Sequence, residues 1–370
     1  MARIDELSAA PVFNVKEYAR IDDYQGFEAE AIANLYYKTY KITQKDLLRQ
    51  VSYPYPETLD PVWIHEKAME PDVIWKVVTD TLTDKVIGSG TVLLNRANQR
   101  AYVRGVMIDP AYQGFGLGGY ILVNAFREII KDHRDVVKIF WTESRTAHNK
   151  SQKIAEASGL RPVGLLPNKD IFLEKRESDL LMVLYSMNTL KTRRPDPQII
   201  PEVLPIYNII AKQFRLEPVE PVTHFFSNTA NGYQVVGSIT ADHYDYCYCT
   251  FEANGQQLKF MVNPRVGVAE RLWWPPDTHL VTLKMLLEKA VIALRPHIFY
   301  MEGYVSAFQP QVQQVFVDLG FRPTGYIPGW DLVDGQREDA IIMTWVRELP
   351  PFVNVACTKR SEPIARLFLQ

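Results

Sequence analysis

The feature that most constrains the fold of this 370-residue chain is a segment that occurs twice. GLRPVGLLPNKD, residues 159–170, aligns without gaps on GFRPTGYIPGWD, residues 320–331, and both contain the same Gly, Arg, Pro, Gly, Pro and Asp. The same separation of 161 positions relates RESDLLM, residues 176–182, to REDAIIM, residues 337–343. A period this long indicates duplicated domains, because solenoid repeats are only about 20–50 residues long.

The segments before the repeated stretches also correspond. Helices are expected over AHNKSQKIAEAS and FQPQVQQVFVDL, each running into the shared glycine, and strands are expected before them over KIFWTES and IFYMEGY. The prolines and charges of KTRRPDPQIIPEVLP, residues 191–205, are typical of a linker. We therefore expect one domain in residues 1–190 and a second in residues 191–370, joined by a solvated linker that begins at KTRR.

Composition excludes several classes of function. The chain is 47% hydrophobic and 23% charged with a net charge of -2, the balance of a globular protein and not of a disordered or fibrous one. It has no concentrated basic stripe beyond KTRR, so a nucleic-acid partner is not expected. No signal peptide or membrane-spanning run is recognisable, and three cysteines suit a reducing compartment. We expect a cytoplasmic protein that binds no membrane and no metal; its oligomeric state is left open.

The first half reads as a mixed α/β domain. Strands over residues 73–79, 86–94 and 101–109 are separated by turn signals and form an antiparallel meander. A glycine-rich loop, an apolar helix and the strand that ends at TES follow, and probable helices precede the meander. The expected class is therefore two tandem α/β domains, each a mostly antiparallel mixed sheet flanked by helices.

The glycine-rich loop YQGFGLGGY, residues 112–120, has three interpretations. A plain surface turn needs fewer glycines. A dinucleotide site matches G-x-G-x-x-G from Gly114 to Gly119, with Glu143 as the ribose-binding acid, but an antiparallel meander precedes this loop where a parallel βαβ unit is required. The third interpretation is an anion cradle, in which bare backbone amides and the helix dipole hold a pyrophosphate.

The stretch VMIDPAYQGFGLGG, residues 106–119, resembles the signature Q/R-x-x-G-x-G/A of the GNAT N-acetyltransferase superfamily. The resemblance implies acetyl-CoA, or another acyl-CoA, as co-substrate. Pantetheine would pair with the backbone of the preceding strand, and the loop amides would bind the pyrophosphate. An asparagine of the next helix contacts the coenzyme in this family; Asn149 is the candidate, His148 matches if the helix aligns without a gap, and helix capping is an equal alternative for Asn149. The cofactor residues so implied are Val106, Met107, Ile108, Gln113, Gly114, Phe115, Gly116, Leu117, Gly118, Gly119 and Asn149.

The resemblance also implies direct attack of an amine on the thioester. Such a reaction needs a base, an oxyanion donor and, in many members, a tyrosine acid. Glu143 and Ser144 close a strand near the expected thioester, so Glu143 is the candidate base; a plain surface carboxylate is the alternative. The oxyanion donor would be a main-chain amide near Met107 or Ile108. The tyrosine position falls near residues 155–156, and neither residue is a tyrosine, so the acid is in doubt.

The acceptor side is marked by aromatic and acidic residues. Tyr36, Tyr40 and Tyr55 belong to a dense group of aromatic residues around the early helices and are the candidate substrate-binding residues; burial in the core is the alternative. PNKD, residues 167–170, with the nearby acidic Glu177 and Asp179, suits a cationic acceptor, although a polar hairpin turn accounts equally well for PNKD.

The second copy lacks the glycine loop. Its counterpart is RLWWPPDTH, residues 271–279, in which Pro275 and Pro276 supply no backbone N–H, so we expect no coenzyme there and expect Asp277 or Thr278 to cap the following helix. The leading hypothesis is a CoA-dependent N-acyltransferase that moves an acetyl group from acetyl-CoA to a primary amine of a small molecule or peptide. The alternative is a non-catalytic acyl-CoA-binding sensor or interaction protein.

Overall fold

The structure is a computed structural model that describes residues 13–18, 27–42, 53–113, 117–186, 188–223 and 234–369. The chain divides into two compact units, Met1–Thr142 and Glu143–Gln370, which we call the N-terminal and C-terminal units. The division falls within one strand and differs from the boundary expected at residue 190. Two domains of 1–190 and 191–370 remain a prediction, because compact units and duplicated segments need not coincide.

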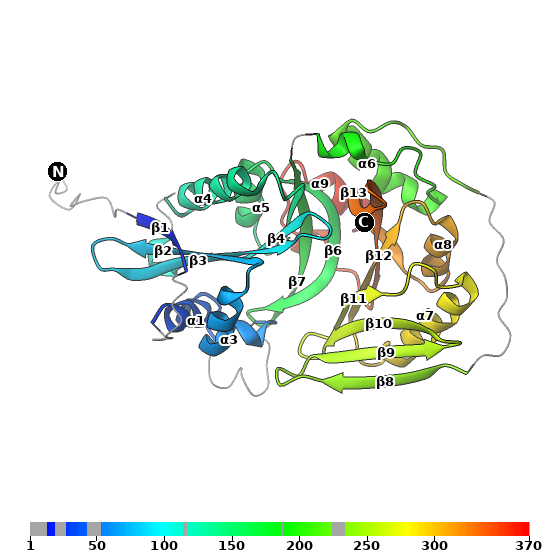
Figure 1. The fold of residues 1–370 in the computed structure, drawn as a ribbon, viewed down its shortest axis with the longest axis horizontal. Coiled ribbons are helices and arrows are strands. Elements are labelled where there is room, and N and C mark those ends of the chain that lie inside the picture. Colours follow the sequence, from blue (N-terminus) through cyan, green and yellow to red (C-terminus); the bar gives the residue numbers. More distant parts are fainter. Residues whose placement is uncertain are drawn as a thin grey trace. The chain divides into compact units, whose positions relative to one another are not determined.

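Among its described residues, the N-terminal unit contains five neighbouring strands in the order β1-β2-β3-β4-β5. The neighbours pair antiparallel, except β4 and β5, which are parallel. Helices α1 and α3 lie on one face of this sheet and α4 lies on the other (Figure 1). The elements are β1 (Phe13–Glu17), α1 (Phe27–Thr39), the 3-10 turn η2 (Pro56–Leu59), α3 (Pro61–Met69), β2 (Val73–Asp80), β3 (Lys85–Asn95), β4 (Arg100–Ile108), η3 (Pro110–Tyr112), α4 (Leu117–His133) and β5 (Ile139–Arg145).

Local sequence accounts for these elements. Apolar residues of β2 and β3 are buried, and the indole of Trp75 donates a hydrogen bond of 2.8 Å to the hydroxyl of Ser89 across the hairpin. Helix α3 begins at Pro61 because the Asp60 side chain accepts from the amide of Val62 at 2.9 Å and proline fits the first helical turn. The predicted antiparallel meander is confirmed.

The described part of the C-terminal unit contains nine strands in the order β7-β6-β13-β14-β12-β11-β10-β9-β8. Within it, α7 packs on β9 and β10, and α6 packs on β13. The elements are α5 (Lys150–Ala157), β6 (Arg161–Phe172), β7 (Lys175–Tyr185), η4 (Thr189–Thr192), η5 (Pro201–Val203), α6 (Leu204–Phe214), β8 (Val236–Ala241), β9 (Cys247–Ala253), β10 (Gln256–Asn263), β11 (Val268–Trp273), α7 (Leu280–Leu294), β12 (Tyr300–Ser306), α8 (Pro310–Asp318), β13 (Arg322–Val333), β14 (Gln336–Val346), η6 (Phe352–Asn354) and α9 (Glu362–Phe368).

The element order repeats along the chain. β2-β3-β4-α4-β5-α5-β6-β7 is followed by β9-β10-β11-α7-β12-α8-β13-β14, and the bounds of β5, β6 and β7 recur in β12, β13 and β14 after 161 residues. The β6–β7 hairpin shifts register between Pro162 and Gly164, and the β13–β14 hairpin shifts between the equivalent Pro323 and Gly325. The mixed α/β class, with mostly antiparallel sheets and flanking helices, is confirmed.

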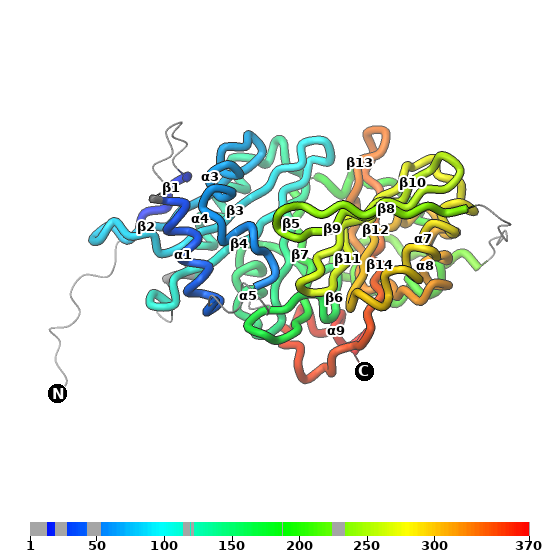
Figure 2. The backbone as a smooth tube through the Cα atoms, turned by 90° about the horizontal axis from the view of Figure 1, so that it is seen from below, coloured from blue at the N-terminus to red at the C-terminus, as the bar shows by residue number. Residues whose placement is uncertain are grey.

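The two repeated segments pair with each other at equivalent glycines. Gly164 of β6, a green strand in Figure 2, lies opposite Gly325 of β13, an orange strand, in an antiparallel bridge. A Cβ atom on Gly164 would lie 2.9 Å from the Cα of Gly325, and one on Gly325 would lie 2.8 Å from the Cα of Gly164. Only glycine permits this approach, which explains why the repeat keeps both.

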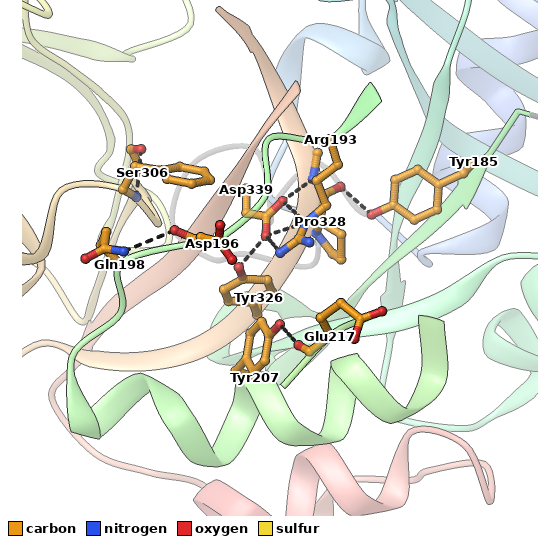
Figure 3. Close-up of polar contacts among 12 residues, drawn as sticks. Tyr185, Arg193, Asp196, Gln198, Tyr207, Glu217, Ser306, Tyr326, Pro328 and Asp339 are labelled. Atoms are coloured by element: carbon orange, nitrogen blue, oxygen red, sulfur yellow. Dashed lines mark hydrogen bonds and ion pairs between the residues drawn. The ribbon is translucent and has the colours of Figure 1, made fainter. Parts of the chain in front are cut away.

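The expected linker is not solvated throughout. The guanidinium of Arg193 donates from Nε to the Asp339 carboxylate at 2.6 and 2.8 Å, and that carboxylate also accepts from the Tyr326 hydroxyl and from the Gly329 amide (Figure 3). Asp339 is fully buried. The expectation of a solvated KTRR segment is therefore wrong for Arg193, because a buried carboxylate needs a cation and hydrogen-bond donors.

Candidate functional site

The candidate site of the N-terminal unit is the end of β4. Among the described residues, the β4–β5 ladder consists of three residue pairs and ends at Tyr102 and Trp141. Beyond it, the Thr142 hydroxyl donates to the carbonyl of Val103 at 2.8 Å. On its other side β4 bulges at Gly105, whose φ is +62°. Among the described residues, the edge of β4 beyond Val103 therefore has no ladder partner in β5. Such an edge can accept an extended ligand that carries amides.

The predicted cofactor residues lie at this end of β4 and at the start of α4. Val106 is exposed, whereas Met107 and Ile108 are buried. The Gln113 amide donates to the carbonyl of Ile108 at 2.8 Å and so ties the loop to the strand end. Leu117, Gly118 and Gly119 form the first turn of α4. Gly114, Phe115 and Gly116 lie outside the described residues, so the loop that would hold the pyrophosphate stays a prediction.

The predicted substrate tyrosines form one cluster in the N-terminal unit. The ring centroid of Tyr36 lies 5.3 Å from that of Tyr53 and 6.3 Å from that of Tyr40, and Tyr53 lies 5.5 Å from Tyr55. Tyr36 is buried, whereas Tyr40 and Tyr55 are partly exposed. A Cβ on Gly105 would collide with the Tyr36 hydroxyl, so the cluster borders the β4 bulge. The alternative that these tyrosines are core residues is therefore correct for Tyr36 and Tyr53 but not for Tyr40 and Tyr55.

Two charged residues of this cluster were not predicted. Arg104 directly precedes the bulge, with its guanidinium 3.7 Å from the Glu57 carboxylate and 5.0 Å from the ring centroid of Tyr55. Burial raises the pKa of Tyr36 well above its usual value, so its hydroxyl stays protonated and can only donate or accept hydrogen bonds at neutral pH. The signal available in the sequence was an arginine next to a strand glycine.

In the C-terminal unit, Glu143 is not a free surface carboxylate. Its Oε1 atom lies 3.0 Å from the Nζ of Lys169, and only 11% of its side chain is exposed. Ser144, the next residue on β5, is buried. The surface-carboxylate alternative is therefore wrong: a buried cation holds the candidate base in place.

Lys169 is the centre of a buried cluster. Besides Glu143, its ammonium contacts Glu270 and Glu302, each at 3.2 Å, and the Tyr300 hydroxyl donates to Glu302 at 2.7 Å. Burial lowers the pKa of Lys169, but the carboxylates outweigh burial and leave that pKa well above its usual value. Burial raises the pKa of Glu302 to about 7. The cluster joins residues from both repeats and could not be read from sequence spacing.

The acidic group around PNKD is also resolved. PNKD lies within β6, and the hairpin turn follows it at residues 173–174, so the hairpin-turn alternative is wrong. Glu177 is held by Arg145 through two hydrogen bonds of 2.7 and 2.9 Å. Asp179 is buried, and burial raises its pKa well above the usual range. Neither carboxylate is an open site for a cationic acceptor.

Two expected helix caps are absent from the structure. Asn149 occupies the N-cap position of α5 without a side-chain capping hydrogen bond, and its amide donates to the carbonyl of Cys357 at 3.4 Å. His279, not Asp277 or Thr278, occupies the N-cap position of α7, and the Thr278 hydroxyl donates to the carbonyl of Pro275 at 2.6 Å. Both capping interpretations are therefore wrong, because local turns and distant carbonyls take these side chains.

Comparison with known families identifies part of the chain. The model of the acetyltransferase (GNAT) family matches residues 32–159. This segment is similar to a GNAT acetyltransferase domain, and we call it the GNAT domain. The GNAT domain includes the whole of β4, the glycine loop, α4 and β5. It contains the residues predicted to bind the coenzyme, the candidate tyrosines Tyr36, Tyr40 and Tyr55, and Glu143, whereas PNKD, Glu177 and Asp179 lie beyond it. No curated protein matches the chain.

Solved structures of acetyltransferases also resemble the chain. A ribosomal-protein-S5-alanine acetyltransferase from Vibrio fischeri is 16% identical, with a TM-score of 0.37 over 48% of this chain and 94% of its own. A spermidine N-acetyltransferase from Vibrio cholerae, solved with CoA and spermine, is 14% identical, with a TM-score of 0.36 over 47% and 95%. The ribosomal-protein-S18-alanine N-acetyltransferase from Escherichia coli is 16% identical, with a TM-score of 0.35 over 47% and 94%.

The described ranges of the chain contain neither a candidate metal site nor a helix that could span a membrane. No three or more His, Cys, Asp or Glu side chains in these ranges are grouped so that they could hold a metal ion. None of the helices in the same ranges is both long and apolar enough to cross a membrane.

Proposed function

We propose that the chain is a CoA-dependent N-acyltransferase that transfers an acetyl group from acetyl-CoA to a primary amine of a small molecule or peptide. The observation that carries the proposal is the edge of β4 within the GNAT domain. This edge leaves the β4–β5 ladder at Tyr102 and leads into the glycine loop that precedes α4. Pantetheine amides would pair with Val106, Met107 and Ile108, and the loop from Gln113 to Gly119 would bind the pyrophosphate.

The reaction we propose is direct attack in a ternary complex. The amine nitrogen bonds to the thioester carbonyl carbon, Glu143 takes the proton that the amine loses, and the C–S bond breaks to release CoA thiolate. A main-chain amide near Met107 or Ile108 would stabilise the oxyanion. The position of the tyrosine acid in other members falls near Ala155 or Glu156, and neither residue is a tyrosine. The Glu156 carboxylate accepts a hydrogen bond from the Thr358 hydroxyl. The thiolate would then leave without a tyrosine acid.

The acceptor would bind at the tyrosine cluster. Tyr40 and Tyr55 are partly exposed, and the neighbouring Arg104–Glu57 pair supplies polar atoms at the β4 bulge. Rigid tyrosines offer both an apolar surface and a hydroxyl at low entropic cost. From this lining we propose the class of the acceptor, a primary amine of a small molecule or peptide.

We further propose that residues 191–370 are a degenerate second copy of residues 1–190. The repeated element order and the 161-residue spacing of three strands support this proposal. Pro275 and Pro276, which stand where the first copy has glycines, remove the amides that a pyrophosphate needs. The second copy would act as a scaffold for the first.

A non-catalytic acyl-CoA-binding sensor is the second candidate. It is favoured by the missing tyrosine acid and by the proline-bearing loop of the second copy. A sensor would bind an acyl-CoA with the same β4 edge and glycine loop but would turn over no amine.

Thiol release separates the two candidates. The wild-type protein is given acetyl-CoA and a panel of primary amines, and free CoA thiol is measured beside the acetylated product. We expect turnover on at least one amine and a fall in kcat of about 10²- to 10⁴-fold in Glu143→Gln, because the base is lost. Glu174→Gln, an exposed carboxylate in the β6–β7 turn, is the matched control. Tight binding without turnover on any amine would support the sensor.

A further inference from the structure

The ammonium of Lys169 is shared by carboxylates from both repeats. Lys169 itself lies on β6, where only 2% of its side chain is exposed. One partner, Glu143, lies on β5 of the GNAT domain, whereas Glu270 and Glu302 lie on β11 and β12 of the second repeat. A single positive charge thus meets three carboxylates within hydrogen-bond distance. The charges do not balance, so each carboxylate competes with the others for the ammonium.

The contact between positions 143 and 169 recurs in altered form in the second repeat. The positions 161 residues later are Tyr304 and Trp330, whose rings stack with centroids 5.7 Å apart. The same pair of positions therefore meets in both repeats, as an ion pair in the first and as an aromatic pair in the second. The ionic version is specific to the copy that carries the candidate base.

We propose that Lys169 is a positioning residue for Glu143, and that Glu302 of the second repeat is coupled to Glu143 because both carboxylates share the Lys169 ammonium. When Glu302 carries a proton, Lys169 is attracted mainly to Glu143 and Glu270. When Glu302 is ionised, the ammonium is divided among three carboxylates, and its attraction to Glu143 weakens. This inference rests on the proposed function for its catalytic meaning, but the coupling itself does not require turnover.

Several other groups of the C-terminal unit face this cluster. Tyr300 donates a hydrogen bond to Glu302, and Tyr304 lies in the field of Glu302, Lys169 and Glu143. Asp179 of β7 lies in the field of Glu143 and Lys169 and is itself flanked by acidic groups. Burial raises the pKa of Glu302 to about 7, so its charge changes near neutral pH. On β11, Glu270 also lies 3.9 Å from the guanidinium of Arg271. Asp170 on β6 and Glu177 on β7 act on Asp179, and Glu177 is paired with Arg145 on β5.

The test is a titration of Glu302 by NMR in the full-length chain. Protein labelled with ¹³C at glutamate carboxyl carbons is titrated from pH 4 to about pH 9, and the Glu302 resonance is assigned by its loss in Glu302→Gln. We expect its midpoint to fall by roughly one pH unit in Glu143→Gln, which removes a competing negative charge. We expect it to rise by roughly one unit or more in Lys169→Met, which removes the shared cation. Lys175→Met, an exposed lysine at the start of β7, should leave the midpoint unchanged.

A second test of the coupling is the dependence of kcat on pH. In the wild type, kcat should rise as the pH increases through the Glu302 midpoint, and Glu302→Gln should remove this step while leaving the protein folded. Lys169→Arg, which keeps the charge, should restore much of what Lys169→Met loses. If Lys169→Met does not fold, Glu143→Gln still gives the titration of Glu302. The double variant Lys169→Met/Glu302→Gln then serves as the kinetic control, because it removes one positive and one negative charge together.

The outcomes distinguish the two proposals. A Glu302 midpoint that is the same in the wild type and in Glu143→Gln would overturn the coupling, whatever the activity. Coupling in the titration without thiol release on any amine would leave the inference standing and count against the proposed reaction. Turnover with an unshifted midpoint would leave the reaction standing and reject the coupling.

Discussion

At the scale of single residues, the C-terminal unit is distinguished by acidic side chains kept away from water. Glu302 and Asp179 are buried, and both have pKa values raised by burial. Lys169 compensates part of this charge and is itself buried. A buried carboxyl that is neutral costs less free energy than an ionised one, so these groups bind protons more tightly in the folded chain than in the unfolded chain.

Stability should therefore fall as the pH rises. The folded pKa of Glu302, about 7, lies above the usual 4.5, so its contribution to stability is complete below pH 4.5 and is lost as the pH rises through 7. Asp179 acts in the same direction. We expect the difference in unfolding free energy between pH 5 and pH 8 to shrink by about 1–3 kcal/mol in Glu302→Gln. Urea denaturation at the two pH values measures it, and an unchanged difference in the variant would contradict this assignment.

At the scale of elements, the sequence predicted local structure better than contacts. The meander, the strand before TES and the helices at AHNKSQK and FQPQVQQ lie within a few residues of β2, β3, β4, β5, α5 and α8. Periodicity and turn residues determine such elements locally. PNKD was open to two interpretations because its polar composition hides a bulged, buried strand. No local pattern indicates that Lys169 meets Glu302, 133 positions away.

The contact between β6 and β13 gives a prediction at this scale. Gly164→Ala places a Cβ 2.7 Å from the Ile342 Cδ1 and 2.9 Å from the Gly325 Cα, so the strands must separate. We expect a loss of about 1–3 kcal/mol in unfolding free energy. Gly90→Ala is the matched control, because its Cβ would meet Val106 at an ordinary 3.5 Å. Thermal unfolding of both variants measures the difference, and equal midpoints would show that β6 and β13 tolerate a side chain.

At the scale of the whole molecule, two divisions of the chain coexist. The compact units divide at Thr142 and Glu143, whereas the repeat predicts a boundary near residue 190. The Lys169 cluster and the Gly164–Gly325 bridge show why: both join the end of the first repeat to the second within one unit. The repeat describes how the sequence recurs, whereas packing decides which segments form a compact body.

The repeat also accounts for what could be predicted of the site. The loop around Gly116 could be predicted because four glycines in so short a stretch are rare in the sequence. The lack of such a loop in the second copy could be predicted because prolines at 275–276 stand where the glycines would be. The Arg104–Glu57 pair and the cluster around Lys169 lack such marks, since each depends on residues brought together by folding. The residues that line the proposed acceptor site therefore indicate the class of acceptor.

The central claim is that one chain binds one coenzyme A, at the glycine loop of the first copy. Isothermal titration calorimetry of CoA into the full-length protein measures it directly. We predict one site per chain in the wild type and loss of binding in Gly116→Trp, because a bulky side chain would fill the space next to the pyrophosphate amides. Val353→Trp, at an exposed position of the C-terminal unit, is the control. No binding, two sites per chain, or full affinity in Gly116→Trp would contradict the claim.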